Sequence, residues 1–88
     1  MKRVRVVVHG LVQGVYFRDT TRQLALRHGV AGWVRNNRDG TVEAVFEGEP
    51  EAIERLVASC REGPRGAVVK QVDVYDEPAK RLRGFEVR

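Results

Sequence analysis

The chain has 88 residues, of which 42% are hydrophobic and 32% are charged, and its formal net charge is +4. These values are typical of one folded domain with one modest core, and they exclude a disordered chain. No apolar run approaches the roughly 20 residues of a membrane span, and Met1–Arg5 leads into no apolar run long enough for a signal peptide. We therefore expect a cytoplasmic protein without a membrane partner.

The positive charge leaves two kinds of partner open. It fits an anionic small substrate, and it also fits nucleic acid. Cys60 is the only cysteine, so no internal disulfide can form. Since His9, His28 and Cys60 are the only soft ligands, the sequence predicts neither a structural zinc site nor a bound cofactor.

The first half of the chain predicts a strand, a helix and two further strands. In Lys2–His9 apolar residues alternate as in a half-buried strand, and Phe17–His28 has helical spacing with Gly29 as a C-terminal cap. Val30–Asn37 alternates again, and Asp39-Gly40 is a hairpin signal. Beyond this turn the predicted strand presents one face with Val42, Ala44 and Phe46 and another with Glu43 and Glu47.

The second half predicts a helix and two strands. Pro50 suits the first helical position, an apolar stripe that ends in Cys60 follows, and Gly63-Pro64 stops the helix. Cys60 completes this stripe, so we interpret it as a buried thiol. Ala67–Tyr75 is predicted to be a strand with Val68, Val72 and Val74 on one face, followed by a break at Asp76-Glu77-Pro78 and a last short strand at Gly84–Arg88.

This order is βαββαβ with an added terminal strand. It predicts an α+β, ferredoxin-like domain over residues 1–88, with a mainly antiparallel sheet and two helices on one face. Such a fold serves many activities and names none of them.

The stretch Gly10–Arg18 predicts an anion site. It leaves a strand, opens a helix and contains two glycines, which can take positive φ angles. Backbone N–H groups of the loop and of the first helical turn can then converge on one point, where the helix dipole is positive. Arg18 adds a guanidinium that can bind two phosphate oxygens at once. We therefore expect a cradle of phosphate size.

Two motifs carry a resemblance to a known family. Gly10-Leu-Val-Gln-Gly-Val-Tyr-Phe-Arg18 and Gly32-Trp-Val-Arg-Asn-Asn37, followed by Asp39-Gly-Thr-Val42, resemble the acylphosphatases, which hydrolyse the carboxyl–phosphate bond of acyl phosphates. The resemblance covers the full length, including the ending Phe85–Arg88. It implies a small acyl phosphate as substrate, a site that phosphate or sulfate can also occupy, and a monomer.

The resemblance also implies roles for individual residues. Arg18 would bind the phosphate and Asn36 would position the attacking water. The backbone amides that would form the cradle are those of Leu11, Val12, Gln13, Gly14 and Val15. Two positions depart from the family pattern. Leu11 stands where a basic residue is common in the family. Tyr16 is bulkier than the small residues often found at its position, and its size is expected to affect the acyl side of the pocket.

This chemistry requires few functional groups. The leaving group is a carboxylate, so no general acid is demanded, and phosphoryl transfer depends mainly on positioning and charge stabilisation. The sequence has no clustered metal-binding set, no nucleotide-binding Gly-rich Lys-Ser/Thr loop and no Ser or Cys flanked by a plausible base. We expect hydrolysis without a metal ion and without a covalent intermediate.

Two alternatives remain. RNA-recognition domains share a similar element order, but they place paired aromatic residues on the open face of the sheet and carry a signature that this sequence lacks. Such a module would bind RNA or another anion without catalysis. Acylphosphatase-like domains also occur attached to larger carbamoyl-transferring proteins, but with nothing appended to the 88 residues we expect a free enzyme.

Overall fold

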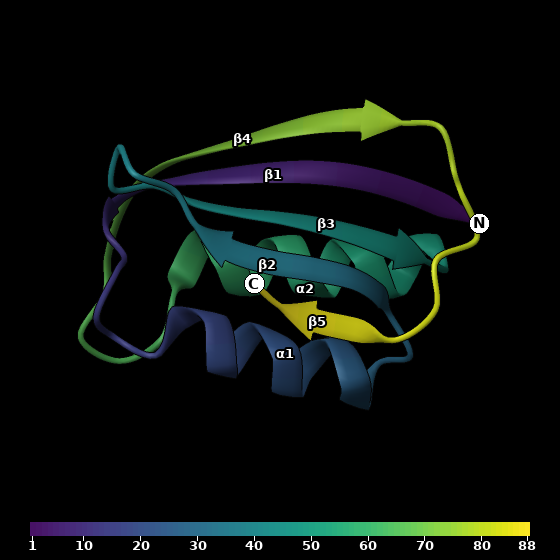
Figure 1. Ribbon diagram of the computed structural model, residues 1–88, viewed down its shortest axis with the longest axis horizontal. Coiled ribbons are helices and arrows are strands. Elements are labelled where there is room, and N and C mark those ends of the chain that lie inside the picture. Colours follow the sequence, from purple (N-terminus) through teal and green to yellow (C-terminus); the bar gives the residue numbers. More distant parts are fainter.

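In the computed structural model, which describes all 88 residues, five strands form one sheet in the order β4-β1-β3-β2-β5. Neighbouring strands are antiparallel, except that β2 and β5 are parallel. Both helices pack on one face of this sheet (Figure 1), so the predicted ferredoxin-like arrangement is confirmed. The elements are β1 (Lys2–Leu11), α1 (Phe17–Arg27), β2 (Ala31–Asn36), β3 (Val42–Gly48), α2 (Pro50–Glu62), β4 (Val68–Glu77) and β5 (Phe85–Val87).

The hydrophobic core lies between the sheet and the helices. The predicted inward valines of β1 are buried there together with Ile53, Leu56 and Cys60 of α2. Burial disfavours the thiolate and raises the pKa of Cys60 to about 12. The prediction of a buried thiol is confirmed. No helix is long and apolar enough to cross a membrane.

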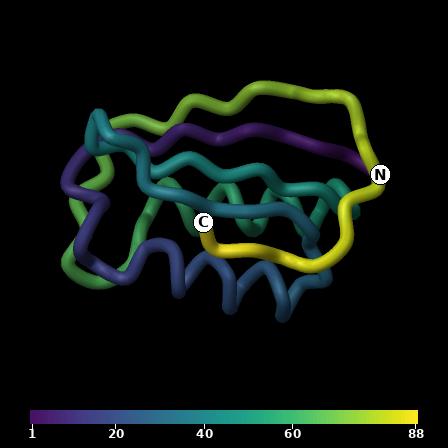
Figure 2. The backbone as a smooth tube through the Cα atoms, in the orientation of Figure 1, coloured from purple at the N-terminus to yellow at the C-terminus, as the bar shows by residue number.

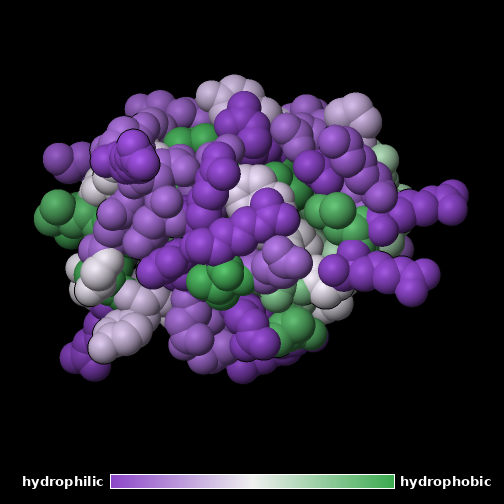
Figure 3. Space-filling model, viewed as in Figure 1, coloured by the Kyte–Doolittle hydropathy of each residue, from purple (hydrophilic) through white to green (hydrophobic).

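The opposite face of the sheet is covered by charged side chains. β3 is buried along its whole length, since Glu43 and Glu47 on this face lie under arginine side chains. Arg35 Nη2 lies 2.9 Å from Glu43 Oε1, and Arg3 Nε lies 3.0 Å from Glu77 Oε1. In the view of Figure 3 most of the surface is hydrophilic, with hydrophobic residues in separate small areas.

β4 is longer than predicted. Asp76 and Glu77, which we expected to end the strand, pair instead with Val4 and Arg3 of β1. The ion pair between Arg3 and Glu77 stabilises this extension of β4. The local sequence alone does not indicate the extension.

The inward face of β4 also differs from the prediction. The register between β1 and β4 shifts by one residue at Lys70, so the alternation of side chains reverses there. Val69 and Val72 therefore pack against the core, whereas Val68 is 50% exposed. The prediction that Val68 shares a face with Val72 was wrong.

The connection from β4 to β5 crosses one end of the molecule, close to the N-terminus (Figure 2). The carboxylate of Glu47 holds this connection in place. The carboxylate is fully buried and accepts hydrogen bonds from the backbone N–H groups of Lys80 and Leu82, each at 2.7 Å. The hydrogen bond from Lys80 is the main reason that the pKa of Glu47 lies below its usual value.

Candidate active site

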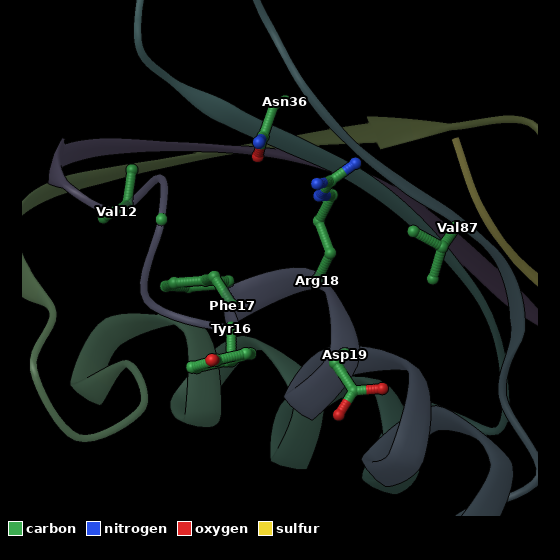
Figure 4. A pocket seen from close by; sticks show the side chains of 8 residues that line it. Val12, Tyr16, Phe17, Arg18, Asp19, Asn36 and Val87 are labelled. Carbon is green, nitrogen blue, oxygen red and sulfur yellow. The ribbon is translucent and has the colours of Figure 1, made fainter.

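A pocket of about 560 Å³ opens where the β1–α1 loop, the first turn of α1, the end of β2 and β5 meet (Figure 4). It contains both side chains to which the family resemblance gave roles, Arg18 and Asn36. The lining residues are Val12, Gly14, Tyr16, Phe17, Arg18, Asp19, Asn36 and Val87.

The loop leaves the sheet later than predicted. Gly10 and Leu11 still belong to β1 and pair with Val69 and Val68 of β4. At Gly10, where φ is 131°, a Cβ atom would collide with the carbonyl oxygen of Val68, so only glycine permits this close approach of the two backbones. The loop then turns at Gly14, where φ is 76°.

Helix α1 begins with an uncapped first turn at the pocket. Its N-cap residue is Tyr16, which has a left-handed backbone (φ 62°, ψ 25°) and makes no side-chain capping hydrogen bond. The backbone donors of the first helical turn have no partner within a helix, and here that turn forms part of the pocket wall. The positive end of the helix dipole therefore lies at the pocket.

The guanidinium of Arg18 points across the pocket toward Asn36 (Figure 4). Its one hydrogen bond runs from Nη1 to the main-chain oxygen of Arg88, the last residue of the sequence, at 3.1 Å, and no Asp or Glu side chain pairs with it. The neighbouring carboxylate of Asp19 points away from Arg18 and accepts a hydrogen bond from Gln23 Nε2 at 2.9 Å. Arg18 thus has no side-chain carboxylate partner and can bind an anion in the pocket.

Asn36 is the last residue of β2, and its side-chain amide extends into the pocket from the side opposite α1 (Figure 4). The amide forms no hydrogen bond within the protein, in contrast to that of the adjacent Asn37, which donates to Thr41 Oγ1 and Glu43 Oε1. A free amide can both donate to and accept from a water molecule. Asn36 lies on the same face of β2 as the buried Val34, and its side chain lines the pocket.

The structure brings together four of the seven residues with an expected role in the site: Val12, Gly14, Arg18 and Asn36. The other three, Leu11, Gln13 and Val15, do not line the pocket, although their backbones belong to the segment that leads into it. Sequence reasoning gave no role to three further pocket residues, Phe17, Asp19 and Val87. Asp19 was detectable as the acidic residue of the first helical turn, and Val87 as the alternating residue of the last strand.

Comparison with known proteins gives this pocket a context. A model of the acylphosphatase family matches residues 4–87. The chain belongs to the acylphosphatase family. It is 62% identical over 88 residues to the acylphosphatase of Rubrobacter xylanophilus, covering 99% of this chain and 80% of that protein. With the acylphosphatase of Gloeobacter violaceus the identity is 59% over 85 residues, covering 97% and 91%.

The acylphosphatase fold is equally clear from a solved structure. The crystal structure of acylphosphatase from Bacillus subtilis superposes with a TM-score of 0.95 at 31% identity, covering 100% of this chain and 99% of that one. Family membership makes the protein a hydrolase that acts on acyl phosphates.

Proposed function

We propose that this acylphosphatase-family protein cleaves the carboxyl–phosphate bond of small acyl phosphates by in-line attack of water on phosphorus. Arg18 and the backbone amides of the segment 11–15, of which Val12 and Gly14 line the pocket, hold the phosphoryl group, and Asn36 positions the water. The proposal is carried by one observation: a guanidinium without a side-chain carboxylate partner and an amide without a hydrogen-bond partner project into the same pocket at the start of α1.

Arg18 supplies positive charge where negative charge gathers. Its planar fork matches two phosphate oxygens, and the first turn of α1 adds backbone donors on the same side. Because no Asp or Glu side chain pairs with it, its charge is available to the substrate. The pocket therefore provides its own cation, and the proposal requires no metal ion.

Asn36 acts by orientation. Its amide oxygen accepts one hydrogen of the water and its NH₂ group donates to the water oxygen, which aims a lone pair at phosphorus. An amide is not a base near neutral pH, so the proton passes to an oxygen of the substrate's own phosphoryl group. The carboxylate leaves without protonation because it is a weak base.

The reaction proceeds without a covalent intermediate in this proposal. The lining has no Ser, Thr, Cys or His side chain, and its one carboxylate, that of Asp19, points away from Arg18 and Asn36. Water is then the nucleophile at phosphorus.

The nucleic-acid alternative finds no support on the open face of the sheet. Trp33 lies there, but the guanidinium carbons of Arg35 and Arg88 lie 5.0 and 4.9 Å from its ring centroid. Tyr75 is covered in the same way by Arg5, at 4.4 Å. Because arginine side chains already cover these rings, they do not form the free pair of aromatic faces on which RNA-recognition domains stack bases.

The proposal is tested by hydrolysis of benzoyl phosphate in the presence of a chelator. The wild type is expected to retain its activity, and Arg18→Ala and Asn36→Ala are each expected to lose roughly 100- to 1,000-fold in kcat/KM. Arg22→Ala, on the exposed side of α1, is the matched control and is expected to behave as wild type. Loss of wild-type activity with the chelator would contradict the proposal.

Isotope labelling tests the site of attack. In ¹⁸O-labelled water, attack on phosphorus places the label in the released phosphate, whereas attack on the carbonyl carbon places it in benzoate. A pre-steady-state measurement with substrate in excess is expected to show no burst of benzoate, because no phosphorylated enzyme accumulates. Label in benzoate would refute in-line attack on phosphorus.

A further inference from the structure

The position of Asn36 is not fixed by its own side chain. Because its amide has no partner in the protein, its direction depends on the backbone at the end of β2 and on the turn that follows. That turn is closed by two backbone hydrogen bonds, from Asn37 N–H to the Thr41 carbonyl at 2.9 Å and from Gly40 N–H to the Asn37 carbonyl at 3.2 Å. The direction of Asn36 therefore depends on the contacts that hold this turn against the phosphate cradle.

The side chain of Gln13 makes that connection. Its Nε2 donates to the carbonyl of Asn37 at 2.7 Å and to the carbonyl of Thr41 at 3.0 Å. These are the only hydrogen bonds that join the loop at residues 12–16 to the turn at residues 37–41. One of the two acceptors belongs to the residue directly after Asn36.

We infer that Gln13 is a positioning residue, whose side-chain amide sets the distance between the phosphate cradle and Asn36. This inference rests on the proposed function, since it concerns the separation of bound phosphoryl group and water. The chemistry is specific to a primary amide, because two N–H donors on one nitrogen can reach two carbonyl oxygens. Each carbonyl already accepts a backbone N–H, and Gln13 uses its second lone pair.

The contact of Gln13 with the turn is expected to affect phosphate binding and the chemical step differently. Phosphate affinity depends on the loop, α1 and Arg18, which do not require the turn. The chemical step depends on the water, which Asn36 holds on the other side of the pocket. Loss of the Gln13 side-chain amide is therefore expected to lower kcat while leaving phosphate binding nearly intact, because small errors of placement act on the reaction more than on binding.

The test compares Gln13→Met, which keeps the length of the side chain and the backbone amide but has no donor, with the wild type. We expect kcat for benzoyl phosphate to fall roughly 10- to 100-fold, while the inhibition constant of inorganic phosphate changes by less than about threefold. Gln13→Asn, whose amide is one methylene shorter, is a second variant with the same expectation. Gln71→Met is the matched control, because Gln71 also donates its amide, to Asp73 Oδ1 at 2.7 Å, but on the far edge strand.

A double-mutant cycle with Asn36→Ala identifies the route of the effect. If Gln13 acts through Asn36, adding Gln13→Met to Asn36→Ala is expected to cost nothing more. Additive losses would overturn the inference, as would a folded Gln13→Met with wild-type kcat or with phosphate affinity lost in parallel with kcat. Failure of the proposed function is distinguishable, since the wild type itself would then not hydrolyse benzoyl phosphate or Asn36→Ala would be fully active.

Discussion

The arginines of the open sheet face and the arginine of the pocket meet opposite conditions. On the sheet, Arg35 and Arg3 lie against carboxylates at 2.9 and 3.0 Å. In the pocket, Arg18 pairs with no Asp or Glu side chain and donates only to the main-chain oxygen of Arg88, the last residue of the sequence, at 3.1 Å. A guanidinium already paired with a side-chain carboxylate offers little to an anion, whereas one at a helix N-terminus without such a partner is stabilised when an anion binds.

The carboxylates show the same contrast. Burial raises the pKa of Glu43, but hydrogen bonds from Arg35 and Asn37 and the charges of Arg35 and Arg5 outweigh it and hold the pKa below its usual value. The charge of Glu43 thus stabilises the fold. In a chain with many arginines, their number does not show which of them is functional. The partners of each arginine show whether its charge serves the site or the fold.

The largest difference between the two regions is expected from one substitution made in both. Arg18→Lys is expected to lower kcat/KM for benzoyl phosphate roughly 100-fold or more, since a single ammonium cannot replace the fork. Arg35→Lys is expected to keep wild-type activity per folded molecule. Steady-state kinetics with circular dichroism checks both variants, and wild-type-like turnover of Arg18→Lys would remove the functional half of the contrast.

A smaller effect, on stability alone, is expected from Glu47→Gln. One oxygen acceptor becomes an NH₂ group facing a backbone donor of Lys80 or Leu82, and a buried N–H without a partner costs roughly 1–3 kcal/mol. Urea denaturation measures this loss. Glu86→Gln, at an exposed pair with Arg88, is the control, and equal stabilities of the two variants would contradict a structural role for Glu47.

The depressed pKa values of Glu43 and Glu47 predict acid sensitivity of the fold. A carboxyl group whose pKa is lower in the folded than in the unfolded state stabilises the protein above its ordinary pKa, which is 4.5 for glutamate. That contribution is lost as the pH falls through the folded-state pKa. The free energy of unfolding is expected to decline below a pH of about 4.5. Urea titrations of Glu47→Gln are expected to show a shallower decline, and an identical slope would contradict the assignment.

The smallest effects are expected from two tyrosines. Tyr16 is 82% exposed and strained at φ 62°, so Tyr16→Asn is expected to raise the free energy of unfolding by roughly 0.5–1 kcal/mol, since asparagine tolerates this conformation. Tyr75→Asn is expected to lower it by a similar amount because it removes the contact with Arg5. Thermal unfolding distinguishes them, and a fall in both would show that Tyr16 is not strained.

The fold was largely predictable from the sequence because most elements carry complete local signals. Pro50 and Gly63 bound α2 as predicted, and the alternation in β1 identified its buried face. β4 was predicted less well, because the bulge at Lys70 and the pairing of Glu77 with Arg3 depend on the neighbouring strand. No pattern within β4 encodes either feature.

The residues of the site were also only partly predictable from the sequence. Arg18 and Asn36 could be named because they stand in recognisable motifs, and the structure places both in one pocket. The side chain of Gln13 could not be assigned, because its acceptors are backbone carbonyls 24 and 28 residues away, which carry no sequence signal. The burial of Glu47 was equally hidden, since its partners lie 33 and 35 residues further along the chain.

Cys60, the one thiol, is 2% exposed and has a pKa raised to about 12. Alkylating reagents consume thiolates, so they meet this group only in molecules that have opened. The rate of alkylation therefore reports the fraction of molecules in which Cys60 has become exposed. Phosphate that binds the closed form slows that rate in proportion to its occupancy, which gives an affinity for the pocket even in variants that no longer turn over substrate.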